Sequence, residues 1–340
     1  MQEDRKKIHI FNSFMNPYGG SEQETLFLYE NLKEVADVSM WAASSRASKI
    51  LLEEHQIRKI SVLSRNVPQG GTYVFAGAHW RNKAWPLFIT PPERLIYIFN
   101  TFHPKIAALI GKLPFWLRWP DAEIVLISEF QKNILGLAGV VHPSPIDASR
   151  FLPAEAADRP FTVGRMSRDT ADKHHAEDKD LYCALLDMGC HLEIQGGTVL
   201  QEQLGRRPNC NLLAEGTFAA EVFLNRLDVF CYRSGTHVET FGRVVLEAMA
   251  CALPVVCHVH GGYAEHIEHG ENGFLFRTTA EAVDIIGTLK ADPAMRHRIG
   301  AQARATVERL FSRDALRRRT RFYVDRLEKP EASSAPGHAI

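Results

Sequence analysis

The sequence predicts an α/β protein built from two doubly wound, Rossmann-like domains that face a central cleft. Its 340 residues suit about two domains of ordinary size. Short apolar runs alternate with helical segments in both halves, which is typical of a parallel sheet covered on both faces. A proline-rich stretch without sustained periodicity, residues 140–160, separates the halves and is interpreted as the interdomain linker.

The first domain is predicted over residues 1–150. Its strands are expected at short apolar or alternating runs, namely IHIFNSF, VSMWAA, ISVL, TYVFAGA, RLIYIF and EIVLIS. After the first of these, NPYGGSEQ is expected to form a turn and ETLFLYENLKEV an amphipathic helix.

The second domain is predicted over residues 151–312, with strands at FTVGRM, HLEIQGG, NCNLLA, DVFCYR, PVVCHV and GFLF. Arginine-rich helices are expected from about residue 293 to 310 and from 313 to 327, the second within a closing segment 313–328. The tail 329–340 is too polar and too rich in small residues to fold. Ligands of open parallel sheets bind beyond the carboxyl ends of the strands, so we expect one site in the cleft.

The composition argues against several classes of protein. Lys and Arg equal Asp and Glu, at 40 each, so no global positive field indicates a nucleic-acid partner. The six cysteines form no C-x-x-C pair, which is typical of a reducing compartment. No signal peptide precedes the first apolar run, and no eighteen-residue apolar window is present. These features predict a cytoplasmic protein.

The stretch HVETFGRVVLEAMACALPVV is the most informative part of the chain. Glu239 and Glu247 bracket a predicted helix start, with Phe241 and Gly242 between them. Helical rise would separate the carboxyl groups by about 12 Å, roughly the reach from the sugar to the ribose of a nucleotide sugar. The free N–H groups of a first helical turn suit the diphosphate between those two ends.

The segments ETFGRVVLEAMACALPVV and GGYAEHIEHGENGFLF resemble sequence motifs of the retaining glycosyltransferases of family four, which have the two-domain GT-B fold. That family usually reads close to EGFGLVLLEAMACGLPVV, so Thr240 replaces a glycine and Arg243 an apolar residue. The alternative is a buried helix whose two glutamates form salt bridges. The resemblance implies transfer of a hexose-type sugar from a UDP or GDP donor to a hydroxyl acceptor, with retention and without a metal or other cofactor.

The resemblance also implies roles for individual residues. Glu239 would hold sugar hydroxyls and Glu247 the ribose, while the backbone around the helix start would hold the diphosphate. The donor-binding candidates there are Thr240, Phe241, Gly242, Arg243 and Val244.

Cations and glycines elsewhere complete this predicted donor site. Arg165 and Lys173, in VGRMSRDTADKHH, correspond to the family's phosphate clamp, although their spacing is eight rather than about five; Arg168 is the substitute for Lys173. Gly19 and Gly20 lie in the first strand-to-helix turn, where the backbone can approach a phosphate. The alternative there is a plain turn, with the next two residues capping the helix.

Two sets of histidines are candidates for chemistry. His103 ends RLIYIFNTFHP, and the resemblance places a histidine near the transferred sugar at this point; a core or loop histidine is the alternative. His258, His260, His266 and His269 lack a cysteine or carboxylate set at metal spacing, so no metal site is predicted.

The acceptor is expected to be a carbohydrate or a lipid-linked sugar in bacterial polysaccharide or glycolipid assembly, with a small-molecule acceptor as the alternative. The segment 105–119 mixes basic residues with aromatics and predicts either peripheral contact with an anionic membrane or a packed helix. The other classes are a non-catalytic nucleotide- or sugar-binding protein and an NAD-dependent oxidoreductase. Against the oxidoreductase, no G-x-G-x-x-G follows the first strand.

Overall fold

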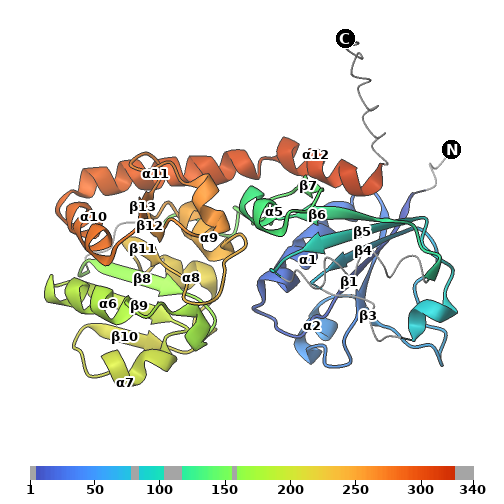
Figure 1. Cartoon of the computed structure of the whole chain (residues 1–340), viewed down its shortest axis with the longest axis horizontal. Helices are drawn as coiled ribbons and strands as arrows, with labels where there is room; N and C mark the ends of the chain where they lie inside the picture. Colours follow the sequence, from blue (N-terminus) through green and yellow to red (C-terminus); the bar gives the residue numbers. More distant parts are fainter. Residues whose placement is uncertain (1–4, 78–83, 103–116, 155–158, 326–340) are drawn as a thin grey trace, which may run out of the picture.

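The computed structural model describes residues 5–77, 84–102, 117–154 and 159–325. Two α/β domains lie side by side, and a pair of consecutive helices runs across both of them (Figure 1). Helices α5 (Glu129–Leu135) and α9 (Arg243–Ala250) lie where the two domains meet. The predicted fold class, two doubly wound domains, is confirmed.

The first domain is a seven-stranded parallel sheet with the order β3-β2-β1-β4-β5-β6-β7. The strands are β1 (Lys7–Asn12), β2 (Asp37–Ala42), β3 (Ile57–Lys59), β4 (Thr72–Ala76), β5 (Arg94–Phe99), β6 (Ala122–Leu126) and β7 (Val140–Val141). Its helical segments are α1 (Gly20–Leu32), α2 (Lys49–Glu54), η1 (Trp85–Phe88) and α5. The strand order reverses between β1 and β4, which is where this fold binds ligands.

The second domain repeats that topology in six parallel strands, in the order β10-β9-β8-β11-β12-β13. The strands are β8 (Thr162–Met166), β9 (His191–Gln195), β10 (Cys210–Leu213), β11 (Val229–Tyr232), β12 (Val255–His258) and β13 (Phe274–Phe276). The helical segments are η2 (Ala171–Lys173), α6 (Asp178–Asp187), η3 (Thr198–Leu200), α7 (Gln201–Leu204), α8 (Ala220–Leu224), α9, η4 (Gly262–His266) and α10 (Thr279–Ala291). Its order reverses between β8 and β11.

Two predicted elements differ from the structure. Helix α1 begins at Gly20, so the last residues of the predicted turn form its first turn. The run ISVL is not a strand: β3 ends at Lys59, and a bridge between Ser61 and Asn66 turns the chain away from the sheet. Leu63 in that run is fully exposed, so its apolar character reflects no core position.

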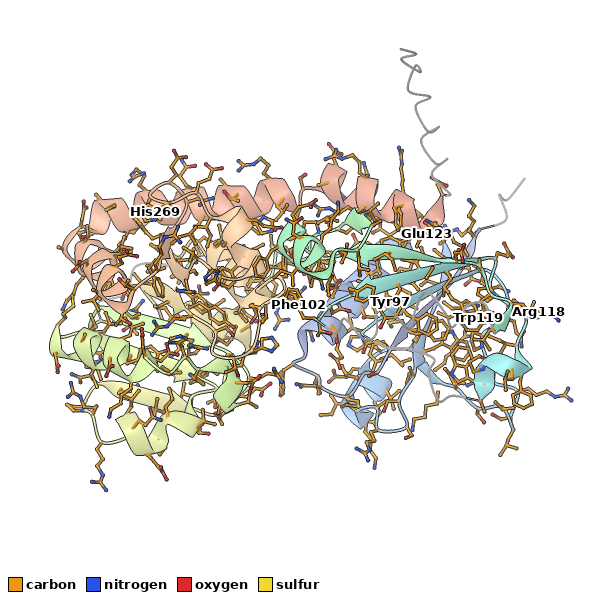
Figure 2. All side chains as sticks on the ribbon, viewed as in Figure 1. Tyr97, Phe102, Arg118, Trp119, Glu123 and His269 are labelled. Atoms are coloured by element: carbon orange, nitrogen blue, oxygen red, sulfur yellow. The ribbon has the colours of Figure 1, made fainter. Side chains whose placement is uncertain are left out.

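A cluster of stacked aromatic rings covers one face of the first sheet. Phe11 stacks on Phe75 and on Trp85, with ring centroids 4.4 and 5.4 Å apart. Trp119 joins this cluster with 6% of its surface exposed, and it lies among the packed side chains in Figure 2. Of the segment 105–119, only residues 117–119 are described, and for Trp119 the packed alternative holds. In the described ranges, no helix is both long and apolar enough to cross a bilayer.

Helices α11 (Pro293–Leu310) and α12 (Arg313–Val324) carry the chain back to the first domain (Figure 1). Arg94, at the start of β5, donates to the carbonyl oxygens of Phe322 and Tyr323 at 2.6 and 3.2 Å. Helix α11 also bonds the interdomain linker, because Arg304 donates to the Phe151 carbonyl at 2.9 Å. Helix α12 ends at Val324, before the predicted end at residue 327, because Asp325 already has an extended backbone. The tail 329–340 lies outside the described residues.

Candidate functional site

The loops that carry the predicted donor-site residues leave neighbouring strands of the second sheet. Strands β8 and β11 pair directly, with Phe230 opposite Gly164. The loop after β8 leads to Lys173 in η2, and the loop after β11 leads to Glu239. Both loops therefore start at the carboxyl edge where the strand order reverses, as expected for a ligand site of this fold.

Glu239 and Lys173 form a largely buried ion pair, with Lys173 Nζ 2.7 Å from Glu239 Oε2. The hydroxyl of Tyr232 donates to the same oxygen at 2.8 Å. Burial opposes the charge on Glu239, but the ammonium of Lys173 outweighs it, so the pKa of the Glu239 carboxyl lies below its usual value. The site thus presents an ionised acceptor held by two donors.

Tyr232 is a member of this group that sequence reasoning did not identify. Its only signal is position, because it is the last residue of β11 and so stands at the carboxyl edge of the sheet. Burial raises its pKa well above the ordinary value, and the hydroxyl therefore stays a proton donor.

Arg165 lies in the interior of the second domain and bonds the backbone of Lys173. Only 1% of its surface is exposed. Its guanidinium donates to Asp178 Oδ2 at 3.0 Å, to the Arg233 carbonyl at 2.7 Å and to the Lys173 carbonyl. The observed role of Arg165 is to position the backbone that carries Lys173, and a direct phosphate contact stays a prediction. The substitute, Arg168, is half exposed and lies 3.5 Å from a carboxylate oxygen of Asp172.

Helix α9 begins at Arg243, directly after Gly242, which has a left-handed backbone with φ of 80°. A Cβ at Gly242 would lie 2.5 Å from Tyr263, so both conformation and space favour glycine here. Among the described residues, no side chain caps this helix end. Glu239 precedes the helix, so helical rise does not apply to its separation from Glu247 and the expected 12 Å is not a valid estimate. Phe241 is buried, and Val244 is half-buried in the first helical turn.

Thr240 joins the glutamate loop to the first domain. Its hydroxyl donates to the carbonyl oxygen of Asn100, just after β5, at 2.8 Å. Its own carbonyl accepts from the hydroxyl of Ser128, at the start of α5, at 2.5 Å. The residue that departs from the family's glycine is therefore a contact between the domains.

Arg243 also crosses between the domains. Its guanidinium donates to the Ser144 hydroxyl at 3.0 Å and to the Pro145 carbonyl at 2.5 Å, and lies 3.6 Å from Glu247 Oε1. Burial raises the pKa of Glu247, against the opposing charge of Arg243. Glu247 thus lies in helix α9, as predicted, and also forms a long salt bridge of the kind that the alternative expected. Its contact with a ribose stays a prediction.

Gly20, in the predicted glycine turn, lies next to Arg243 at the start of helix α9. A Cβ on Gly20 would lie 3.3 Å from Arg243 Cδ, so the first loop of one domain contacts the first helical turn of the other. The amide of Gly19 donates to the Asn16 carbonyl at 3.0 Å. Glu22 accepts from the amides of Met15 and Asn16 at 3.2 and 3.3 Å, so its carboxylate orders the loop. Diphosphate contacts from Gly19 and Gly20 stay predictions.

The histidines fall into two groups. His103 lies outside the described residues; Phe102, which precedes it, lies on the side of the first domain that faces the second (Figure 2). The rings of His258 and His260 are 5.1 Å apart, while His269 Nδ1 lies 3.0 Å from the Leu275 carbonyl. In the described part of the chain, no group of His, Cys, Asp and Glu could hold a metal ion.

Comparison with known proteins shows that part of the chain resembles a known family. Residues 199–306 match the family described as "Glycosyl transferases group 1". The chain is 41% identical over 76 residues to N-acetyl-alpha-D-glucosaminyl L-malate synthase of Bacillus anthracis, a match to 22% of this chain and 20% of that protein. It is 35% identical over 95 residues to the capsular polysaccharide biosynthesis glycosyltransferase CapM of Staphylococcus aureus, covering 26% of this chain and 24% of the relative. The matches thus span about a fifth to a quarter of these curated relatives.

The whole chain resembles solved structures. The Anabaena protein HepE, solved in complex with UDP and glucose, aligns over 92% of this chain and 98% of its own with a TM-score of 0.70 and 20% identity. Fold and site together define a protein with the GT-B fold. The resemblance to group 1 glycosyltransferases is confirmed over residues 199–306, which include Glu239, α9 and Glu247.

Proposed function

We propose that this protein is a retaining, metal-independent glycosyltransferase that moves a hexose-type sugar from a UDP or GDP donor to a hydroxyl acceptor. The match of residues 199–306 to the group 1 glycosyltransferases carries this proposal, because that segment holds Glu239, α9 and Glu247. A UDP donor is supported by the HepE complex with UDP and glucose. The likeness to CapM supports an acceptor in polysaccharide assembly, and a lipid-linked sugar fits the same proposal.

In the proposed reaction, the bond from the anomeric carbon to the diphosphate breaks, and a bond to the acceptor oxygen forms on the same face. The acceptor proton passes to the leaving phosphate oxygen, so the protein supplies no separate base. Its work is to position the donor and stabilise the charge that develops on the diphosphate. Glu239 would accept hydrogen bonds from sugar hydroxyls. Lys173, whose Nζ lies 2.7 Å from Glu239 Oε2, would stabilise charge on the diphosphate.

A nucleotide titration tests the donor half of the proposal. Purified protein is heated with UDP, GDP, ADP or NAD, and the unfolding midpoint is followed. We expect one nucleoside diphosphate to raise the free energy of unfolding by about 2.7 kcal/mol at a hundred times its Kd, by mass action. Lys173→Ala should weaken this response, while Lys179→Ala, an exposed lysine of α6, should preserve it. A response to NAD alone would favour the oxidoreductase, and no response to any ligand would contradict the proposal.

The acceptor half needs a transfer assay. Labelled UDP-glucose or the responding donor is incubated with bacterial lipid-linked sugars in one arm and with small hydroxy acids in the other. The second arm is favoured by the likeness to the malate synthase of Bacillus anthracis. The anomeric configuration of the product, read by NMR, tests retention; an inverted product would refute that part of the proposal. Donor binding without transfer in any arm would favour a non-catalytic binding protein.

A further inference from the structure

A hollow lies at the junction of η4, α11 and α12, and none of the predicted donor-site residues lines it. Its volume is about 340 Å³, and it is partly open to solvent. Its basic lining residues are Arg309 from α11 with Arg318 and Arg319 from α12. Thr306, Glu265, His266 and Glu268 also line it.

The three arginines of this hollow have no carboxylate partner among the described residues. Arg309 makes a long contact of 3.5 Å with the Thr306 hydroxyl, and Arg319 lies over the ring of Phe311 at 5.6 Å. Arg318 is exposed. Some arginines elsewhere in this chain do have a carboxylate partner, as Arg304 does with Glu308 at 2.7 Å. The hollow therefore gathers guanidinium donors that the protein itself leaves available.

Two polar atoms of the lining are buried without a hydrogen bond. They are Arg319 Nη1 and His266 Nε2. Glu265 Oε1 lies 3.4 Å from the histidine nitrogen, but without hydrogen-bond geometry. Burial lowers the pKa of His266 to about 4, with the charge of Arg319 as the second cause, so this ring is neutral at pH 7. Buried polar groups without a partner are rare in native proteins. The N–H of Arg319 Nη1 is a donor that lacks an acceptor, whereas Nε2 of the neutral His266 ring donates or accepts according to its tautomer.

The acidic residues of the lining do not supply that acceptor. Glu265 Oε2 accepts from the amide of Phe130, at the start of α5 in the first domain, at 3.1 Å. Glu268 is exposed, and its carboxylate forms no ion pair within the described ranges. Helix α12 adds Arg313, Arg317 and Arg321 to the surroundings against one acidic residue, Asp314. The field at the hollow is therefore positive, which favours an anion.

We propose that this hollow binds a phosphate group, carried either by a soluble phosphorylated metabolite or by an anionic lipid headgroup. Arginine suits this ligand because its planar fork donates two parallel hydrogen bonds to phosphate oxygens. Three forks around one hollow match the several acceptors of a phosphate better than the two oxygens of a carboxylate. The Thr306 hydroxyl donates to the Gln302 carbonyl at 3.0 Å, so the arginines supply the donors. Bound phosphate would lie beside Glu265, at a contact between the domains.

The first experiment titrates inorganic phosphate against protein carrying Lys173→Ala, so that the donor site contributes less, with sodium chloride at matched ionic strength as the reference. We expect saturable binding that is about tenfold weaker after Arg318→Gln, since a charge-assisted hydrogen bond is lost. The matched control is Arg317→Gln, which removes the same charge from the next residue without touching the lining, and it should change affinity by less than about twofold. Glu268→Gln should strengthen binding.

Equal weakening by Arg317→Gln and Arg318→Gln would overturn the proposal, because it would show a general charge effect. Absence of saturable binding would overturn the soluble source, and vesicles then decide the lipid source. Sedimentation with phosphatidylglycerol vesicles that is lost in Arg318→Gln and kept in Arg317→Gln supports a headgroup. Failure in both arms refutes the site. In Arg318→Gln, the response to nucleoside diphosphate should be unchanged, so this test is independent of the proposed transferase activity.

Discussion

Glu239 is the residue at which the observed geometry and the proposed chemistry meet. Its carboxylate already receives two hydrogen bonds, one from Lys173 Nζ and one from the Tyr232 hydroxyl. Those donors fix one oxygen and hold the group ionised in a mostly buried place. An acceptor that is prepositioned in this way costs no reorganisation when a sugar binds, which is how enzymes gain most from polar groups.

Glu239→Gln should lower turnover by about a hundredfold or more while the protein stays folded. The change leaves Lys173 without its ion-pair partner, so we expect the free energy of unfolding at pH 7 to fall by about 1–3 kcal/mol. Because the pKa of Glu239 is lowered by folding, this stabilisation is present above the ordinary value of 4.5 and is lost as the pH falls through the folded pKa. The stability difference between variant and native protein should therefore shrink below about pH 4.5.

The matched control for this change is Glu271→Gln, an exposed glutamate of the same domain. Chemical denaturation at several pH values gives the stability difference, and a transfer assay gives turnover. Near-native turnover in Glu239→Gln would remove this residue from the site. A stability difference that grows on acidification would show that the ion pair is not its source.

Arg94 is one of the residues that attach helix α12 to the first domain. Arg94 Nε and Nη2 each lie 2.7 Å from an oxygen of Glu123, and its Nη1 donates to carbonyl oxygens at the end of α12. Glu123 lies on the first domain below the end of this helix (Figure 2). The planar guanidinium can bond the Glu123 carboxylate and the helix carbonyls at the same time. A cation at a helix C-terminus also interacts favourably with the helix dipole.

Arg94→Lys should therefore loosen α12 although the charge is kept. We expect the free energy of unfolding to fall by about 1–3 kcal/mol and amide exchange in residues 313–324 to rise. Arg321→Lys, at an exposed arginine of the same helix, is the control and should change neither quantity. Unchanged exchange in Arg94→Lys would assign the attachment to the apolar side of α12 instead.

At the scale of elements, the sequence predicted what local patterns determine. All six apolar runs of the second half became strands, although β10, at the edge of the sheet, is only partly buried. Helix α11 has the predicted bounds, Pro293–Leu310. The run ISVL failed because burial depends on where the chain turns, and Leu63 turns outward. Arg165 was recognised from its motif, but its partner Asp178 comes from α6, and no local pattern pairs the two.

The whole molecule adds contacts that the sequence did not predict at all. Thr240 was noted as a departure from the family's glycine, yet its partner is a backbone carbonyl 140 positions away. Backbone acceptors carry no sequence signal, so only the arrangement of the domains reveals this bond. Thr240, Arg243 and Glu265 each bond the first domain from the loops around α9. The loops that carry the candidate site are thus also the loops that hold the domains together.

This coupling predicts that Thr240→Val opens the molecule. Valine keeps the shape of threonine but removes the hydroxyl that donates to the Asn100 carbonyl, leaving that half-buried carbonyl without its partner. We expect a loss of about 1–3 kcal/mol in unfolding free energy and a larger radius of gyration by small-angle X-ray scattering. Thr217→Val is the control, since that hydroxyl bonds the Ala214 carbonyl within one domain at 2.8 Å. If the two variants have the same radius of gyration as the native protein, the other contacts hold the domains without Thr240. Suppose instead that only Thr240→Val has a larger radius of gyration and that a nucleoside diphosphate restores the native value. A ligand shifts a population only by its differential affinity for the two states. Donor binding and closure of the two domains would then be one equilibrium.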